Sequence, residues 1–412
     1  MNRLRMLLLA ALIAVLVTVV PMAAAQGNTP QLAYVNSSGQ LVITTADGAS
    51  RWVVTNPNEP LAPRANLTWS PNGQQLFFAV NTGGGISLRA ANPSSQSVAE
   101  LGTVSGNVSG GEWAPDGRSV IVGSAEGILS AAGSAAVIIP GGQLTSGQAF
   151  SPNGRFVFYH NGGGYSLAGA NGANPVTLPG RNDATAAGAG LWADSGAVVA
   201  YWTFTDSGTS ALNVTGAASG ETLTLDSGTS VPVTPLGWLP NSQTLLYRSA
   251  QGVVAVDASC VQRGCAQAPA QTAILPVTVA NVLVTDSNVL VFAGNGGVFG
   301  VNANCVNAGN CADNAVSAGA IAGNSRVAAG GNTLAFTGAN NQVNTLNAGC
   351  VNSGACTPTA TGVTGGVLDI SPRGTFALVN SGGAVQVLNL SNPAGMVSLN
   401  GINSSFPLVW NG

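Results

Sequence analysis

The sequence predicts an all-β fold, a single closed ring of four-stranded blades, because one short phrase recurs along the chain. An aromatic residue is followed by Ser or Ala, then Pro, Asn or Asp, Gly, and a short apolar run. Three clear copies begin at Trp69, Trp113 and Phe150. Three looser copies begin at Trp192, Trp238 and Ile370. Two degenerate copies are centred on Leu283 and Val327, so that successive anchors are 37 to 46 residues apart. That period fits four short strands and their turns, as in the blade of a β-propeller.

The residues after each anchor predict a tight turn and then a strand buried on both faces. Proline presets φ for the turn and glycine accepts a positive φ. The strands that follow, such as 76–80 and 156–159, are apolar on consecutive residues rather than on alternate ones. A blade packed between two other blades has this property, whereas a one-sided sheet does not. After residue 25 no stretch shows sustained helical periodicity.

A second turn signal follows these strands and predicts the next hairpin of each unit. Its nine copies lie at residues 36–39, 83–85, 126–127, 161–164, 206–208, 251–252, 295–297, 340–341 and 381–383. The anchors number one fewer, because the unit at residues 31–54 has the later strands of a blade without an anchor ahead of them.

The missing anchor is expected near the C-terminus, in the segment Phe406–Trp410, about one period beyond Ile370. We therefore predict that the C-terminal strand, with Trp410 as its anchor, completes the N-terminal blade and closes the ring. Closure removes the free sheet edges that favour aggregation. The count gives nine blades; propellers usually carry about four to eight, so eight blades with one atypical unit is the alternative.

The Trp/Phe-Ser-Pro-Asp/Asn-Gly unit resembles the WD40-like repeat of the TolB family, often called PD40. The resemblance extends over essentially the whole chain after residue 25. Because that motif is structural, it implies blade geometry and no active residues. We expect neither the separate N-terminal domain of TolB nor the hydrolase domain of propeller peptidases, so the resemblance does not imply a role in the Tol-Pal system.

Residues 1–25 are typical of a secretory signal, which leaves residues 26–412 for the propeller. Arg3 and Arg5 give a positive start, residues 6–20 an apolar core, and Ala23–Ala25 a small-residue cleavage site before Gln26. The alternative is an uncleaved membrane anchor, but this apolar core is shorter than the ~20 residues that a spanning helix needs.

The six cysteines form three close pairs and predict disulfides. The pairs are Cys260 with Cys265, Cys305 with Cys311, and Cys350 with Cys356. Because their first members are evenly spaced, we expect them in one equivalent loop of three successive blades. An even count at regular spacing in an exported chain is typical of disulfides, each contributing about 2 kcal/mol. Thiolate metal sites need convergent ligands, and pairs on adjacent blades fan outward.

The composition excludes some partners. Charged residues make up 7 % of the chain, and every basic residue is arginine. Without residues 1–25, ten arginines face fifteen acids, a formal net charge of −5 (10 − 15). With no basic patch to neutralise phosphates, nucleic-acid binding is not expected, and the surface must be rich in amides and hydroxyls.

Catalytic groups are sparse. The sole histidine, His160, lies at a strand end before a glycine turn, and no Gly-x-Ser-x-Gly elbow occurs, so a serine triad is excluded. Paired carboxylates remain candidates, and the acids closest to the anchors are Asp116, Asp194, Asp286 and Asp369. The glycine runs 83–85 and 162–164 lie between predicted strands, which favours hairpin turns over phosphate cradles.

Tryptophans could stack on sugars, but those at repeating anchors are more typical of blade-to-blade packing. These are Trp69, Trp113, Trp192 and Trp238. Trp52 and Trp202 lie off the anchors and are the candidates for a binding surface.

Together these features predict an exported, non-enzymatic propeller, secreted, periplasmic or on the cell surface, that binds protein, peptide or glycan on a rim or in its channel. We expect a monomer without cofactor or metal that crosses no membrane once the signal is removed. Two other classes stay open: a propeller enzyme of glycoside hydrolase or lyase type that uses channel carboxylates, and a purely structural envelope or surface protein.

Overall fold

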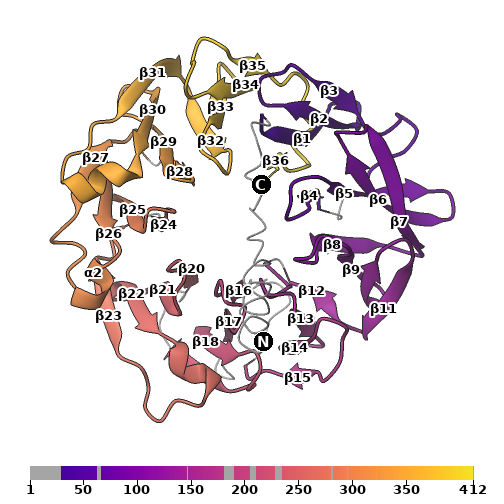
Figure 1. Cartoon of the computed structure of the whole chain (residues 1–412), viewed down its shortest axis with the longest axis horizontal. Coiled ribbons are helices and arrows are strands. Elements are labelled where there is room, and N and C mark those ends of the chain that lie inside the picture. Colours follow the sequence, from indigo (N-terminus) through magenta and orange to yellow (C-terminus); the bar gives the residue numbers. More distant parts are fainter. Residues whose placement is uncertain are drawn as a thin grey trace, which may run out of the picture.

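The described chain forms nine four-stranded antiparallel sheets, arranged as blades of one ring (Figure 1). The computed structural model describes residues 29–62, 66–145, 147–180, 190–204, 210–227, 234–279, 282–294, 296–323 and 325–411. The prediction of an all-β propeller with nine blades is thus confirmed. The predicted signal, residues 1–25, lies outside the described residues.

Within each blade the strands run outward from the centre in chain order, except that blade 1 takes its innermost strand from the C-terminus. Blade 1 comprises β36 (Val409–Trp410), β1 (Gln31–Val35), β2 (Leu41–Thr45) and β3 (Arg51–Val53). Blade 2 comprises β4 (Thr68–Trp69), β5 (Leu76–Thr82), β6 (Gly85–Asn92) and β7 (Ser97–Val104). Blade 3 comprises β8 (Val108–Trp113), β9 (Val120–Ser124), β10 (Gly127–Ala131) and β11 (Ala135–Pro140).

The next three blades continue in the same way. Blade 4 comprises β12 (Gln143–Leu144), β13 (Phe156–Asn161), β14 (Gly164–Gly169) and β15 (Val176–Thr177). Blade 5 comprises β16 (Leu191–Trp192), β17 (Val198–Phe204), β18 (Ser210–Gly216) and β19 (Thr222–Ser227). Blade 6 comprises β20 (Thr234–Trp238), β21 (Thr244–Ser249), β22 (Gly252–Asp257) and β23 (Gln271–Leu275).

The last three blades complete the ring. Blade 7 comprises β24 (Val282–Val284), β25 (Val289–Gly294), β26 (Gly297–Asn302) and β27 (Val316–Ala320). Blade 8 comprises β28 (Val327–Gly330), β29 (Thr333–Thr337), β30 (Gln342–Asn347) and β31 (Thr359–Thr364). Blade 9 comprises β32 (Gly366–Ile370), β33 (Phe376–Ser381), β34 (Ala384–Asn389) and β35 (Val397–Ser398).

The two ends of the described chain are joined in blade 1, as predicted. β36 pairs antiparallel with β1 through Leu32 opposite Trp410 and Ala33 opposite Val409. The backbone amide of Asn411 donates to the carbonyl of Gln31 at 2.9 Å. The C-terminal strand therefore supplies the inner edge that residues 31–53 lack.

The repeated turn has the predicted backbone. Its first residue accepts a hydrogen bond from the amide of the motif glycine, as between the Ser70 carbonyl and Gly73 N at 2.8 Å. The equivalent glycines all have φ between 64° and 69°, and are Gly73, Gly117, Gly154, Gly196 and Gly374. Only glycine takes this left-handed conformation without a steric cost. The second turn signals also fall between the second and third strands, except that residues 206–208 and 295 lie outside the described residues.

The core lies between the blades, which explains the consecutive apolar residues. Residues 76–80 of β5 are all buried. Phe77 packs with Trp113 in the cluster shared by blades 2 and 3, whereas Phe78 packs with Ile43 in the cluster shared by blades 1 and 2. Successive side chains of a strand point to opposite faces, so both faces of the blade are covered.

Indole groups join neighbouring innermost strands. Trp69 Nε1 donates to the Val409 carbonyl at 3.1 Å and Trp113 Nε1 donates to the Thr68 carbonyl at 3.0 Å. In blade 6, Trp238 Nε1 donates to Leu191 O of blade 5 at 2.9 Å. Each of these three anchor tryptophans therefore donates to a backbone carbonyl in the innermost strand of the preceding blade. That carbonyl belongs to the residue directly before the anchor of the preceding blade.

The three disulfides are present, and each closes the loop between the third and fourth strands of its blade. They join Cys260 to Cys265, Cys305 to Cys311, and Cys350 to Cys356 in blades 6, 7 and 8. Their Cα–Cα distances, 4.9 to 5.2 Å, are ordinary for disulfides.

Each disulfide loop contains a short helix that packs on the preceding blade. η1 (Ser259–Gln262) contacts β18, α2 (Cys305–Ala308) contacts β23, and η2 (Ala348–Ser353) contacts β26. One valine in each helix is buried beneath it, and these are Val261, Val306 and Val351. In blades 7 and 8 the anchors are Leu283 and Val327, which have no indole, and there the disulfide loops hold the blade to its neighbour.

Candidate binding face

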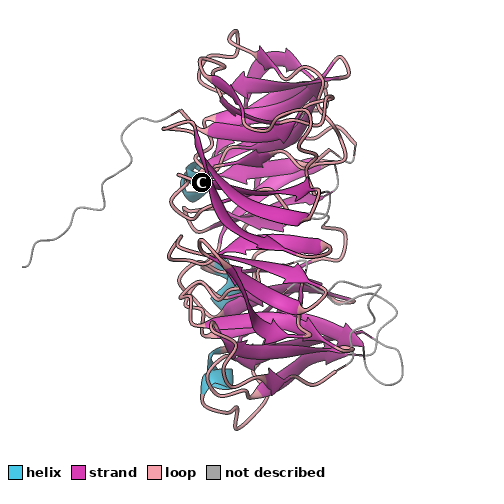
Figure 2. Ribbon diagram, turned by 90° about the vertical axis from the view of Figure 1, so that its right-hand side faces the viewer, coloured by secondary structure: helices cyan, strands magenta, loops and turns pink. Residues whose placement is uncertain are grey.

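Equivalent connections lie on the same side of the ring because the strands alternate in direction. In every blade except 1 and 4 the first strand ends at the motif turn, and the third strand ends at the loop that carries the disulfides in blades 6 to 8. These connections share one face with η1, α2, η2 and the C-terminal end of β36 (Figure 2). We call it the disulfide face. The hairpins between second and third strands lie on the opposite face.

Three surface cavities open on the disulfide face. The first, of about 340 Å³, lies where blades 1, 2 and 9 meet, and is called the seam cavity because both ends of the described chain line it. The second, of about 550 Å³, lies between blades 5 and 6. The third, of about 490 Å³, lies between blades 7 and 8.

Amide and hydroxyl side chains line the seam cavity. The main ones are Gln31, Asn72, Gln74, Asn92, Ser94 and Asn411. Arg373, in the motif turn between β32 and β33, is the charged residue of this lining. Asn411 also accepts a hydrogen bond from the amide of Gln31 at 2.6 Å, so the closure of the ring shapes the cavity directly.

The second cavity combines polar side chains with two carboxylates. Asp194 Oδ2 accepts from the amide of Asn241 at 2.9 Å, and Asp257 Oδ1 accepts from the amide of Ser259 at 2.8 Å. Both carboxylates thus bind the backbone of blade 6, and the first of them does so from blade 5.

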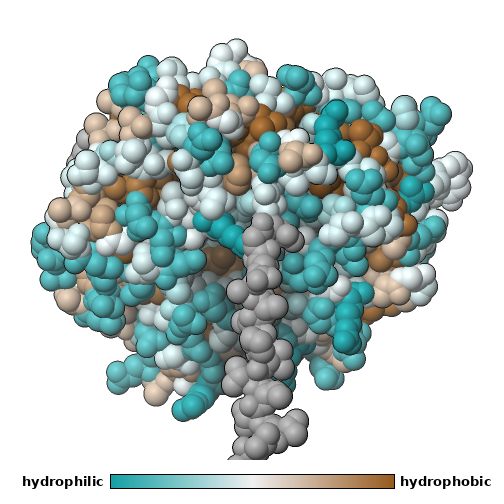
Figure 3. Space-filling model, turned by 45° about the horizontal axis from the view of Figure 1, so that its top comes forward, coloured by the Kyte–Doolittle hydropathy of each residue, from teal (hydrophilic) through white to brown (hydrophobic). Residues whose placement is uncertain are grey.

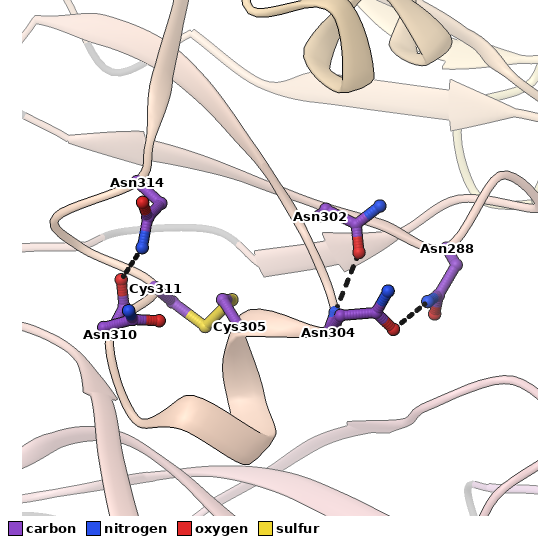
Figure 4. Close-up of a disulfide and its surroundings, with 7 residues drawn as sticks. All are labelled: Asn288, Asn302, Asn304, Cys305, Asn310, Cys311 and Asn314. Carbon is purple, nitrogen blue, oxygen red and sulfur yellow. Dashed lines mark hydrogen bonds between the residues drawn. A yellow bond between two sulfur atoms is a disulfide. The ribbon is translucent and has the colours of Figure 1, made fainter.

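The third cavity is an array of asparagines beside the Cys305–Cys311 disulfide (Figure 4). Asn302 Oδ1 accepts from the amide of Asn304 at 2.9 Å, while its Nδ2 donates to Asn352 Oδ1 of blade 8 at 2.8 Å. Asn314 Nδ2 donates to the carbonyl of Asn310 at 2.9 Å. Two of these bonds hold the backbone of the loop, and Asn304 Oδ1 also accepts from Asn288 Nδ2 at 3.4 Å. Asn304, Asn310 and Asn352 are exposed.

The chemistry of the face is that of neutral hydrogen bonding. An amide side chain carries both donors and acceptors, so it can bind a hydroxyl group, which is also both. In the space-filling view, hydrophilic and neutral residues cover most of the visible surface, and apolar residues form separate small areas (Figure 3). Among the residues that the structure describes, no exposed large apolar residue lines one of the three cavities; these residues are Val53, Val98, Val137, Val176, Val277 and Met396.

The four carboxylates singled out in the sequence come from separate blades. Asp116, Asp194 and Asp286 are exposed in the motif turns of blades 3, 5 and 7, and Asp369 is half-buried on β32. Asp116 Oδ1 accepts from the amide of Arg118 at 3.0 Å, as a turn aspartate does. In the described part of the chain, no group of three or more His, Cys, Asp or Glu is placed to hold a metal ion.

A carboxylate that the sequence did not single out, Glu112, bridges blades 3 and 4. It lies on β8 beside Trp113, and its two oxygens accept from the amides of Ala149 at 2.7 Å and Phe150 at 2.9 Å. The anchor of blade 4 is a phenylalanine, which has no N–H to donate, so Glu112 makes the interblade bond in the opposite direction. No local signal singled it out, because charged residues, Arg326 and Asp369, also directly precede the anchors of blades 8 and 9.

Burial raises the pKa of Glu112 from 4.5 to about 7, although the two amide hydrogen bonds favour the carboxylate. The unfolded chain therefore loses this proton at lower pH than the folded one. We expect the contribution of Glu112 to the free energy of unfolding to be highest below pH 4.5. It should fall by about 3 kcal/mol as pH rises towards 7.

Chemical denaturation at a series of pH values between 4 and 8 measures this effect. Glu112→Gln should remove the fall between about pH 4.5 and 7. Glu59→Gln is the matched control, because the hydrogen bond from Arg89 lowers the pKa of Glu59, so its contribution is lost only as pH drops below that window. An unchanged slope in Glu112→Gln would contradict the assignment.

The remaining candidate residues are spread over the ring. His160 lies on β13, edge-on to Tyr165 with ring centroids 6.1 Å apart, and its buried Nε2 has no hydrogen-bond partner among the described residues. Trp52 is half-buried against the cluster between blades 1 and 2, and Trp202 is half-buried on β17. None of the three lines one of the cavities of the disulfide face.

Comparison with known proteins shows the fold. No protein-family model and no curated sequence matches the chain. A crystal structure of a eukaryotic initiation factor is similar at a TM-score of 0.62 and 12 % identity, over 93 % of this chain and 98 % of that one.

Two further propellers are similar at lower scores. Dipeptidyl peptidase 4 from Porphyromonas gingivalis matches at a TM-score of 0.50 and 11 % identity, over 92 % of this chain and 59 % of that one. TolB from Acinetobacter baumannii matches at 0.32 and 16 % identity, over 57 % and 63 %. The likeness to the initiation factor shows the fold alone, and at identities this low none of the three matches assigns an activity.

Proposed function

We propose that this protein is an exported, non-enzymatic β-propeller of the WD40-like type that binds glycans on its disulfide face. The observation that carries the proposal is that three cavities open on that face, with linings rich in amides and hydroxyls. Their volumes, 340 to 550 Å³, fall within the ~300–1,000 Å³ of small-ligand sites.

A saccharide fits this face better than a protein does. The core of a protein interface is apolar and anchored by aromatic side chains, whereas these cavities present side chains that both donate and accept hydrogen bonds. Sugar hydroxyls need such partners. Of the exposed apolar residues, Val53, Val98, Val137 and Val176 lie on the outermost strands of blades 1 to 4, away from the cavities.

Several observations favour binding over catalysis. The four candidate aspartates lie in separate blades. Asp194 shares the second cavity with Asp257, and each of these two carboxylates accepts a hydrogen bond from a backbone amide. Glu112, the carboxylate with a pKa near 7, has both oxygens bound to the backbone of the next blade. A glycosidase needs two carboxyl groups facing one bond, about 5–10 Å apart.

Export is part of the proposal. The signal-like residues 1–25 and the three disulfides both favour an extracytoplasmic, oxidising compartment. Among the described residues, no helix has the length and apolar character to cross a membrane. We propose that the mature protein acts as a monomer.

Calorimetric titration with uncharged hexasaccharides tests the proposed function. We expect the purified protein to bind at least one of maltohexaose, cellohexaose and chitohexaose. The double variant Asn304→Ala, Asn310→Ala should weaken binding in the third cavity about thirtyfold, because two neutral hydrogen bonds contribute about 1 kcal/mol each.

The matched control exchanges two exposed asparagines of the opposite face, Asn161→Ala with Asn380→Ala, and should bind as the wild type does. The proposal fails if no hexasaccharide binds, or if both double variants lose binding equally. Cleavage of a bound hexasaccharide would favour the enzyme class instead.

A further inference from the structure

The seam cavity differs from the other two in charge. Its lining contains one arginine and no acid, whereas the second cavity contains Asp194 and Asp257 and the third is neutral. The three cavities of the disulfide face thus carry formal charges of opposite sign or none. This difference indicates that the cavities do not take the same ligand.

Arg373 occupies a turn position where other blades carry a hydrogen-bond acceptor. In three equivalent turns the Oδ1 of Asn72, Asp116 or Asn153 accepts from the backbone amide two residues ahead, at 3.0 to 3.1 Å. Arginine has donors and no acceptor, so it cannot make this bond. In blade 9 the Ser371 hydroxyl accepts from the Thr375 amide at 3.2 Å instead. The arginine therefore contributes nothing of this kind to its own turn.

No carboxylate of the described residues forms an ion pair with Arg373. The ion pair found among the described residues joins Arg89 to Glu59 at 2.9 Å. Arg373 is exposed, and it lines the seam cavity together with amide and hydroxyl residues of blades 1 and 2. Its guanidinium group is therefore available to an anion that enters the cavity.

We propose that the seam cavity binds the anionic group of an acidic saccharide, a carboxylate or a sulfate, through Arg373. This inference rests on the proposed function. The planar guanidinium can donate two parallel hydrogen bonds to such a group. Asn72, Asn92 and Asn411 also line the cavity, and because the Oδ1 of each accepts from a backbone amide, their Nδ2 groups donate to hydroxyls of the same saccharide.

Arg373→Asn tests this role without disturbing the turn, because it restores the Pro-Asn-Gly sequence of Pro71–Gly73. The matched control is Arg118→Asn, which removes an exposed arginine just after the motif turn of blade 3, outside the cavity. Both variants and the wild type are titrated with a uronate hexasaccharide, with sulfated cellohexaose, and with uncharged cellohexaose. Circular dichroism melts of both variants should match the wild type.

We expect the wild type to bind one of the two acidic saccharides at least tenfold more tightly than cellohexaose, and Arg373→Asn to lose that preference. Which acidic saccharide shows it identifies the anion as carboxylate or sulfate. Equal affinity for all three saccharides, or an unchanged preference in Arg373→Asn, overturns the inference and leaves the proposed function intact. An equal loss in Arg118→Asn overturns it too, since a general charge effect would then be responsible.

Discussion

A chain that ends at Ser405, without β36, is expected to lose its closed ring. The innermost position of blade 1 would be empty, exposing the edge of β1, whose residues Leu32 to Val35 are at most 3 % exposed in the closed ring. Phe406, Val409 and Trp410, which pack against the clusters on both faces of blade 1, would be removed as well. Losing these apolar contacts is expected to cost at least about 4 kcal/mol.

The exposed edge is also a template for pairing with another chain. We therefore expect the truncated protein to elute as aggregates or oligomers in size-exclusion chromatography with light scattering. A synthetic peptide of residues 403–412 should restore the monomer by supplying the missing strand. A truncated chain that stays monomeric, with an unchanged unfolding midpoint, would contradict closure by β36.

A point variant separates closure from the chemistry of one side chain. The Nε1 of Trp410 is buried without a hydrogen-bond partner in the described chain, so Trp410→Phe should retain the ring and cost less than about 1.5 kcal/mol. Trp69→Phe should lower the free energy of unfolding more than Trp410→Phe does, because it removes the hydrogen bond to Val409 O and leaves that carbonyl without its indole partner.

Replacing the six cysteines by alanine is expected to lower the free energy of unfolding by about 6 kcal/mol, since each short cross-linked loop contributes about 2 kcal/mol. The loss of stability should first affect the parts of the ring that the disulfide loops contact. η1, α2 and η2 pack on blades 5, 6 and 7, and Val261, Val306 and Val351 are buried beneath them. Hydrogen exchange should therefore rise at β18, β23 and β26 before it rises elsewhere.

Blades 2 and 3 provide the internal control for that experiment. Trp113 joins them through its bond to Thr68, and neither blade contains a cysteine. Their exchange should be unchanged in the alanine variant. If exchange rose uniformly around the ring, or if stability fell by less than about 1 kcal/mol, the disulfide loops would not hold the neighbouring blades.

The repeat made the architecture predictable because its signals are local. The Pro-Asn-Gly turn at 71–73 and the glycine hairpin at 83–85 each need no information from outside their own blade. Closure was predictable for a related reason: the unit at residues 31–54 has no anchor, and Trp410 lies where one is missing. The cysteine pairs were predictable because they recur at one place in three blades.

The features that the sequence did not predict all depend on contacts between blades. Glu112 bridges to a backbone 37 residues away, which no local pattern indicates. The helices of the disulfide loops have four to six residues, too few to show a helical period. Arg373 stands at the Asn/Asp position of the motif copy at Ile370, and its place in a cavity follows only once closure brings blades 1, 2 and 9 together.

Hydrogen–deuterium exchange with and without the tightest-binding hexasaccharide tests the central claim, that the disulfide face binds glycans, most directly. We expect protection in the motif turns at 70–73 and 371–374 or in the disulfide loops at 305–311 and 350–356, with no change in the opposite hairpins at 83–85 and 381–383. Protection confined to those opposite hairpins, or to the outermost strands, would contradict a glycan-binding disulfide face.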